Sequence, residues 1–466
     1  MQRSIEKSLL STRNRTSLLR RRLRRAWPPW RRPVPRLAVP PLERFLRHEA
    51  SSASLLIVAA AAALLWANLA GDSYERVWTA AVRLEVAGFT LEEDTGHLVN
   101  ELLMAVFFYV VALEVKRELL FGALRDVRTA AVPVAAAFGT MVGAAAAYIA
   151  INSGGDLRGW AIPIATDIAF ALGVLGLAGR RAPRELRVFM LILAVVDDLV
   201  TIAVIAIAFT DDLSLAWLAA AAGLVLVVAA SARAGIGTLA LYVPLAGGIW
   251  LAVFESGIHA TLAGVALGFL TPATARSSAW AAGRAVRARL SAVPAAGETA
   301  EGALLEATQL AANSVSPLRR MEHGLTPWSA YAILPLFALA NAGVPLSLGG
   351  VADALTTRIG LGIALGLVVG APLGGILFAW LVVRVGVGRM PQGLDWPAVA
   401  GVAPLKGIGF TIAIFISGLS FNERPLQEQA TLAVLVASVA AAFLGLTVLH
   451  VRYTLVTRRR GRPARE

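Results

Sequence analysis

Two adjacent aspartates, Asp197 and Asp198, lie in the middle of the apolar run LILAVVDDLVTIAV. A carboxylate at the centre of a membrane helix costs about 2.5–3.5 kcal/mol on insertion scales, so an adjacent pair is expensive. Two carboxylates partly removed from water can hold protons or a small cation, and these compete for the same oxygens. The alternative to an ion site is that one aspartate forms a hydrogen bond to a neighbouring helix and the other has no role.

Thr166 and Asp167 provide a second group of oxygen atoms, in the stretch AIPIATDIAFALG. Pro163 removes a helix donor and clashes with the preceding turn, so we predict a broken helix here. A broken helix at membrane depth is tolerated where it is buried or lines a cavity. The Thr166 hydroxyl, the Asp167 carboxylate and freed carbonyls are ligands that hard cations prefer.

A second apolar span, APLKGIGFTIAIF, is interrupted by Pro404, Gly407 and Gly409. Two interrupted spans at corresponding positions of two halves indicate a transport site near the membrane midplane. Glycine pairs also occur where membrane helices simply pack closely, which is the structural alternative for this segment.

The elements that must position these residues are membrane helices. The chain has 466 residues, is 57% hydrophobic and 16% charged, and has a mean hydropathy of +0.68. Soluble domains carry about 25% charged residues. We therefore expect an all-α polytopic membrane protein. A span needs about 20 mainly apolar residues, and we count twelve segments, centred near Ala60, Phe107, Gly139, Phe170, Val196, Gly223, Ala246, Gly264, Phe337, Val368, Ile412 and Val436.

The charge pattern predicts the topology. The net charge of +13 is concentrated at the two ends and in alternate loops, which indicates membrane orientation rather than nucleic-acid binding. Both termini are then cytoplasmic. The chain has no cysteine, which excludes disulfides and thiolate metal sites.

We divide the chain into three parts. Residues 1–48 are an Arg- and Pro-rich cytoplasmic arm that we expect to be disordered, 49–451 form the transmembrane domain, and 452–466 are a basic cytoplasmic tail. Within the domain, 71–97 are an outer loop in which VRLEV and FTLEE predict a β-hairpin around Ala87–Gly88. Its edge could pair with a second copy in a homodimer. The long loop 271–326 is predicted on the cytoplasmic side, with parts that could be amphipathic helix.

Several motifs together resemble the NhaA-type Na+/H+ antiporters, from roughly the first span to the last. They are LEVKREL, ATDIAFALGVLGL, AVVDDLVTIAVIAI, ESGIHATLAGV, MEHGLTPW, LPLFALANAG and GIGFT. The resemblance implies twelve helices in inverted repeats, an architecture for which this family is itself a known example. Two discontinuous helices would cross near the midplane.

The resemblance also implies an activity. It is exchange of cytoplasmic Na+ or Li+ for external H+ across a bacterial inner membrane, with no cofactor and no enzymatic reaction. Asp197 and Asp198 resemble the residues that bind Na+, and Thr166 and Asp167 those at the first crossing. The residues that resemble the pH-response cluster are Glu114, Lys116, Arg117, Glu118, Glu322 and His323, and His259 is a further candidate for pH response.

The chain departs from the family at two positions. The tenth span of the family often carries a lysine before Pro-Leu-Gly, and this chain has Ala371 there. Lys406 lies beside the second helix break, where relatives usually have an uncharged residue. A lysine at this depth needs a carboxylate, so we expect Lys406 to pair with Asp197. The alternative is that Lys406 extends to the cytoplasmic headgroups.

Two other functions stay open at this point. One is a cation/proton antiporter with altered stoichiometry or cation choice, because Ala371 replaces the lysine. The other, more remote, is an intramembrane aspartyl protease. Such a protease needs two carboxylates that face one another and share a proton, which adjacent aspartates on one helix cannot do, although Asp167 could partner one of them.

Overall fold

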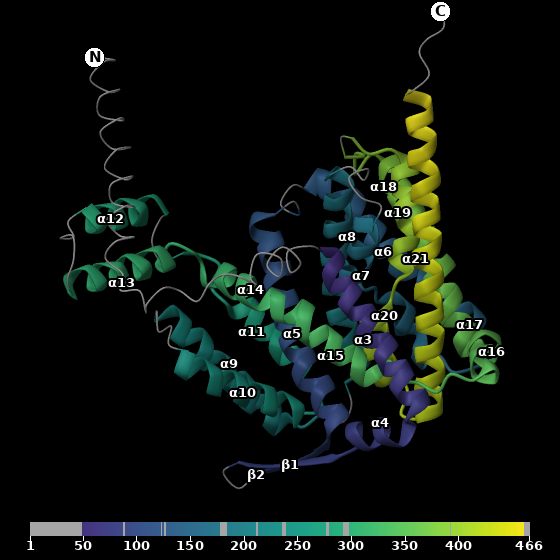
Figure 1. Ribbon diagram of the computed structural model, residues 1–466, viewed down its shortest axis with the longest axis horizontal. Coiled ribbons are helices and arrows are strands. Elements are labelled where there is room, and N and C mark those ends of the chain that lie inside the picture. The colour runs from purple at the N-terminus through teal and green to yellow at the C-terminus, as the bar shows by residue number, and fades with distance from the viewer. Residues whose placement is uncertain are drawn as a thin grey trace, which may run out of the picture. The chain divides into compact units, whose positions relative to one another are not determined.

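The computed structural model describes residues 49–86, 89–122, 124, 127–177, 184–210, 213–234, 239–275, 279–291, 298–391 and 393–460. The predicted arm 1–48 lies outside them. The described part is mostly helical, with a single two-stranded sheet. It separates into a main unit and a smaller one that contains α12 and α13. The main unit, coloured from purple to yellow in Figure 1, carries every candidate residue named above that the structure describes.

Eight helical stretches in the described residues are long and apolar enough to cross a membrane. They contain α3 (Glu49–Leu69), α5 (Thr95–Phe121), α6 (Val127–Ile151), η3 (Arg158–Ile164) with α7 (Ile168–Leu177), α8 (Arg184–Ala208), α9 (Leu215–Arg233), α17 (Arg358–Leu365) with η6 (Gly366–Gly370) and α18 (Ala371–Val385), and α21 (Arg424–Arg460).

Further apolar helices lie where the remaining spans are predicted. A ninth crossing is made if the pair bent by 45° is one span, namely α19 (Trp396–Val402) with η7 (Ala403–Gly407), followed by α20 (Phe410–Ser420). Shorter or internally irregular helices are α10 (Leu239–Phe254), α11 (Thr261–Leu270), and the unbroken succession of α14 (Pro317–Trp328), η5 (Ser329–Ile333) and α15 (Leu334–Asn341). The polytopic helical class is confirmed, and the count of twelve and the inverted repeats stay predictions.

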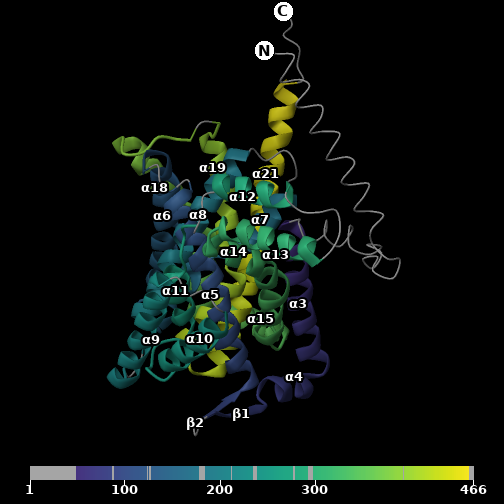
Figure 2. The same ribbon diagram turned by 90° about the vertical axis from the view of Figure 1, so that its left-hand side faces the viewer.

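The predicted hairpin is confirmed. Strands β1 (Ala81–Val86) and β2 (Phe89–Asp94) pair antiparallel, with Val86 opposite Phe89 and Ala81 opposite Asp94. It follows the short helix α4 (Gly71–Trp78). Both views place the hairpin and the C-terminal end of α21 at opposite ends of the main unit (Figures 1 and 2). Near the hairpin end, α16 (Leu348–Thr356) packs beside α17 and α21.

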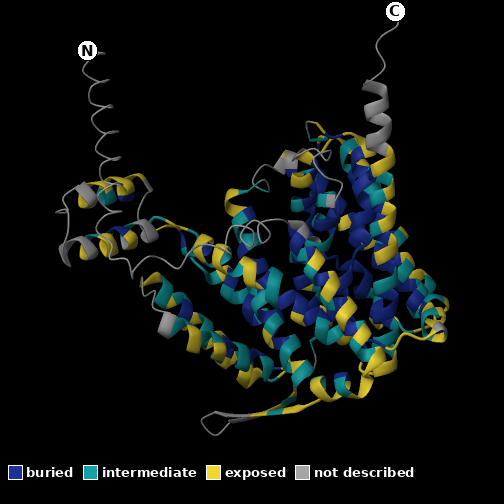
Figure 3. Ribbon diagram, in the orientation of Figure 1, coloured by how far each residue is buried: buried dark blue, intermediate teal, exposed yellow. Residues whose placement is uncertain are grey.

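Glycines allow the closest helix packing in the main unit. Gly139 and Gly143 of α6 face Gly370 and Gly374, and a Cβ added at any of the four would meet the backbone of the opposite helix. Small residues four apart let membrane helices approach in this way. Buried residues gather where the inner helices meet, and exposed apolar residues such as Leu226 and Val243 lie on outer helices (Figure 3). This distribution fits a chain surrounded by lipid.

Much of the predicted loop 271–326 is helical. Its Ala-rich sequence favours helix, and the structure forms α12 (Ala279–Ser291) and α13 (Glu298–Asn313). Arg289 of α12 pairs with Glu306 of α13 at 3.1 Å, and the Arg284 guanidinium lies 3.5 Å from the centre of the Trp280 ring. The helix that follows begins at Pro317, because the Ser316 side chain caps it.

Candidate functional site

Two broken helices meet at the centre of the main unit. The first is irregular between Ile164, where η3 ends, and Ile168, where α7 begins. The second is irregular between Gly407 and Phe410, the end of η7 and the start of α20. The amide of Asp167 donates a hydrogen bond of 2.7 Å to the carbonyl of Ile408. The two breaks therefore join through their backbones.

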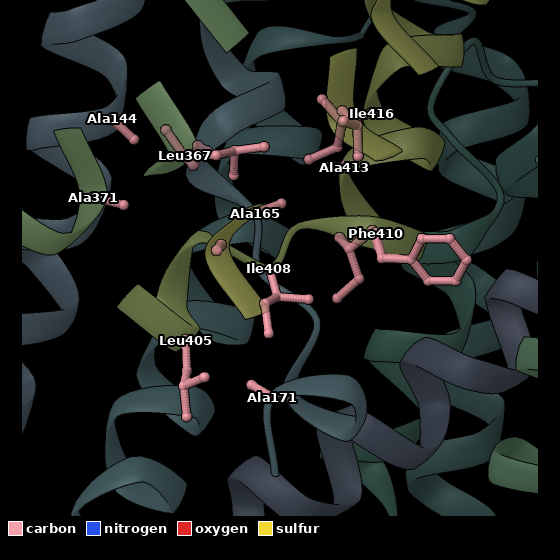
Figure 4. Close-up of a cluster of buried hydrophobic side chains, with 14 of the residues drawn as sticks. Ala144, Ala165, Ala171, Leu367, Ala371, Leu405, Ile408, Phe410, Ala413 and Ile416 are labelled. Carbon is pink, nitrogen blue, oxygen red and sulfur yellow. The ribbon is translucent and has the colours of Figure 1, made fainter. Parts of the chain in front are cut away.

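Small residues make this approach possible. A Cβ on Gly407 would collide with the Leu367 carbonyl, and one on Gly409 would lie 3.1 Å from the Ala165 carbonyl. Pro163 packs against Gly366, where a Cβ would lie 2.8 Å from the proline ring. Apolar side chains enclose the crossing, with Ala165 and Ile408 near its middle and Ala371 on a neighbouring helix (Figure 4). Water is thus largely excluded around the breaks.

Asp167 joins the second halves of both broken helices. Its Oδ1 accepts from the Phe170 amide at 2.9 Å, in the first turn of α7. Its Oδ2 accepts from the Thr411 hydroxyl at 2.5 Å and from the Thr411 amide at 3.3 Å, at the start of α20. Helix N-termini carry partial positive charge, which favours a carboxylate at this position. Asp167 is 2% exposed and serves as a cap shared by two helices.

Asp197 of α8 forms a three-membered network with Thr166 and Lys406. The Lys406 Nζ lies 2.6 Å from Asp197 Oδ2, and the Thr166 hydroxyl donates to the same oxygen. Lys406 also donates to Thr166 Oγ1. The lysine is 2% exposed, so its amine does not extend to the surface. The network ties α8 to both helix breaks.

The remaining oxygens of the aspartate pair have no hydrogen-bond partner among the described residues. Asp197 Oδ1 is buried and has no hydrogen-bond partner among the described residues. Asp198 is 7% exposed, and no hydrogen bond joins its carboxylate to the part of the chain that the structure describes. Within that part, no three His, Cys, Asp or Glu side chains form a metal-binding group. The side-chain oxygens left for a cation at this site are therefore those of the aspartate pair.

Ala371 lies apart from this network. It begins α18, directly after the π-helix η6, and is 1% exposed. Its methyl group packs in the apolar cluster that surrounds the crossing (Figure 4).

Comparisons with known proteins assign the chain to a family. A model of the family described as Na+/H+ antiporter 1 matches residues 43–449. The chain belongs to this family. Among its relatives, the protein named Na(+)/H(+) antiporter NhaA from Rhodopirellula baltica is 42% identical over 429 residues, covering 88% of this chain and 93% of the relative. Proteins of the same name from Koribacter versatilis and Escherichia coli O139:H28 are 41% identical, covering 90% and 88% of this chain and 93% and 98% of the relatives.

The residues that resemble the family's pH-response cluster are only partly together. The Arg117 guanidinium lies 3.2 Å from Glu322 and 3.8 Å from Glu118, and 4.0 Å from Glu114. This joins α5 to α14, where His323 follows Glu322. Lys116 instead donates to the carbonyls of Phe269 and Thr271, both at 2.6 Å, at the C-terminal end of α11.

His259 contacts a different group, Glu101. Its Nδ1 is 3.7 Å from Glu101 Oε1, and the other Glu101 oxygen accepts from the Ala260 amide at 3.1 Å. Both side chains line a cavity of about 760 Å³ that also includes Asp94 of the hairpin. His259 is therefore not part of the Arg117 cluster.

Sequence reasoning did not identify Thr411 as a partner of Asp167. The available signal was a threonine directly after the glycine-rich break, where a new helix starts and an N-terminal hydroxyl is common. It gave no indication that the acceptor would be an aspartate 244 residues away.

Proposed function

We propose that the chain is a secondary antiporter that exchanges cytoplasmic Na+ or Li+ for external H+. The observation that carries this proposal is the buried Asp197–Asp198 pair beside two crossed helix breaks, in a chain whose relatives are named Na+/H+ antiporters. Intramembrane carboxylates that face a helix break are typical of ion and proton pathways.

The exchange follows from competition for the same oxygens. Each proton that the pair holds removes one anionic ligand that a cation would need, and when protons leave, the carboxylate oxygens can bind Na+ or Li+. Asp197 and Asp198 are only 1% and 7% exposed in this structure, so alternating access requires the broken helices to move. Asp167 offsets the N-terminal charge of α7 and α20, and Lys406 lies at the C-terminal end of η7, where a cation is favoured.

The other predicted features belong to the same proposal. The hairpin β1–β2 would join two copies, both termini would be cytoplasmic in an inner membrane, and the Arg117 cluster would adjust activity to pH. Altered stoichiometry or cation choice stays the alternative, because this chain has its lysine at position 406 and an alanine at position 371. No observation favours a protease, since both oxygens of Asp167 are bonded to Thr411 and Phe170.

Everted membrane vesicles from a host without its own antiporters test the proposal. A respiration-driven pH gradient should collapse when Na+ or Li+ is added, and the response should disappear in Asp198→Asn. Gly418→Ala is the matched control, because a Cβ there meets nothing within 4 Å. Absence of any cation response in the wild-type vesicles, at every pH between about 6.5 and 9, would contradict the proposal, since such a site is expected to titrate near neutrality.

A further inference from the structure

The two oxygens of Asp197 lie in different surroundings. Oδ2 receives both the Lys406 amine, at 2.6 Å, and the Thr166 hydroxyl. Oδ1 of the same carboxylate is buried and has no hydrogen-bond partner among the described residues. A buried acceptor without a partner is costly, and a bound ion is one of the features that account for such an atom in native structures. One oxygen of the carboxylate therefore has two partners, and the other has none among the described residues.

Asp198 is the other available carboxylate. It follows Asp197 in α8, about 100° further around the helix axis. It has no hydrogen bond to the described residues, although its charge interacts with those of Asp197 and Lys406. A cation between Asp197 Oδ1 and Asp198 would bind two carboxylates and leave every existing hydrogen bond of Asp197 in place.

The space beside Lys406 leaves its amine little room to move and borders no carboxylate among the described residues. Beside it lies a cavity of about 10 Å³, room for a single water at most. The cavity is bordered by apolar residues such as Phe189, Leu193 and Val402, and by Thr140, whose hydroxyl already donates to the Ala137 carbonyl. An ammonium displaced into this cavity would be buried without a counter-charge, which is strongly unfavourable.

We propose that Lys406 is a positioning residue that stays on Asp197 Oδ2 when the site is loaded, while the cation binds Asp197 Oδ1 and Asp198. This inference rests on the proposed function. It makes the lysine a fixed part of the site that holds Asp197 and Thr166 in place, rather than an internal competitor that the cation must displace.

The sequence permits a direct test, because only three of its 43 basic residues are lysine: Lys7, Lys116 and Lys406. The full-length protein would be reconstituted in lipid with ¹⁵N-lysine and ¹³C-aspartate for solid-state NMR. The dipolar coupling between the lysine Nζ and the aspartate Cγ then reports the Lys406–Asp197 contact. Lys116 bonds to carbonyls of Phe269 and Thr271, and Lys116→Arg removes its signal for assignment.

Spectra would be compared at one pH with saturating Na+ and with choline. We expect the coupling to be the same in both, while carboxylate shifts change with Na+. In the matched variant Asp198→Asn, the coupling should persist and the shift change should be lost. If Na+ abolishes the coupling, the lysine is displaced and the inference is wrong, although the antiporter proposal stands. If Na+ shifts no carboxylate and vesicles show no exchange, the proposed function fails with it.

Discussion

At the scale of single residues, the central feature is a buried ion pair. Asp197 and Lys406 have side chains that are 1% and 3% exposed, and they lie 2.6 Å apart. A buried pair adds little stability compared with apolar residues, but removing one partner leaves a buried charge. The contact between these two side chains should therefore be visible as strong coupling in mutational measurements.

Substitution of Lys406 measures this coupling. Lys406→Gln should lower stability by about 3–5 kcal/mol, because Asp197 loses its counter-charge. The double variant Lys406→Gln/Asp197→Asn should recover most of that loss, because neither group is then charged. Thermal unfolding of the detergent-solubilised proteins checks both values. Additive losses in the double variant would show that the two side chains do not interact.

At the scale of elements, the crossing depends on residues without side chains. Gly407 lies against the Leu367 carbonyl, and Ala441 Cβ would be 3.0 Å from an added Cβ. The helices cannot retain their present separation if a methyl group is inserted there.

Gly407→Ala should destabilise the protein by about 1–3 kcal/mol, as overpacking does, and should reduce exchange because the second break is pushed away from Leu367 and Ala441. Gly418→Ala on the adjoining α20 is the control, since the open space there should make it neutral or slightly stabilising. Melting temperature and vesicle exchange are measured together. Equal effects of the two substitutions would contradict the close contact.

Tyr74 of α4 fixes the end of α15. Its hydroxyl donates to the carbonyls of Leu339 and Ala340, at 3.0 and 2.7 Å, and accepts from the Gly343 amide at 3.2 Å. Tyr74→Phe should cost about 1–3 kcal/mol, because these buried groups lose their partner. If Tyr74→Phe is as stable as the wild type, the hydroxyl does not have this role.

The stability that the Tyr74 hydroxyl contributes should depend on pH. Burial raises the pKa of Tyr74 from 10.0 to about 12. The folded state therefore holds the proton more tightly than the unfolded state, so the contribution of the hydroxyl is complete below pH 10.0 and is lost as the pH rises toward 12. The difference in melting temperature between wild type and Tyr74→Phe should be constant at neutral pH and decrease above 10.0. A difference that increases with pH would have the wrong sign.

At the scale of the whole molecule, a backbone hydrogen bond joins the two points of the main unit between which the α12–α13 segment is inserted in the sequence. The Leu318 amide donates to the Pro272 carbonyl at 3.1 Å, and Lys116 holds the carbonyls of Phe269 and Thr271. All of these residues belong to the main unit.

Replacement of residues 275–315 by a short Gly/Ser linker should therefore leave the ion site intact. We expect the apparent KM for Na+ to be unchanged, because α11 and α14 keep their closing contacts. Na+ titration of exchange in vesicles checks this, with expression level as the control. A large increase in KM at normal expression would show that the α12–α13 unit contributes to the site.

The sequence alone determined the class of the molecule, its hairpin and the positions of its two helix breaks. Long apolar runs require helices in lipid, alternating strands with Ala87–Gly88 between them require a hairpin, and Pro163 and Gly407 interrupt helices through their own backbone properties. These are local effects, so they can be read along the chain. The pairing of Lys406 with Asp197 could be suggested only by analogy.

Only the tertiary structure decided which groups meet. Thr166 is hydrogen-bonded to both Asp197 and Lys406. Asp167 accepts its hydrogen bond from Thr411, which is 244 residues away in the sequence. It also left Asp197 Oδ1 without a described partner. Such contacts depend on how distant helices pack, and no local preference of the chain encodes them.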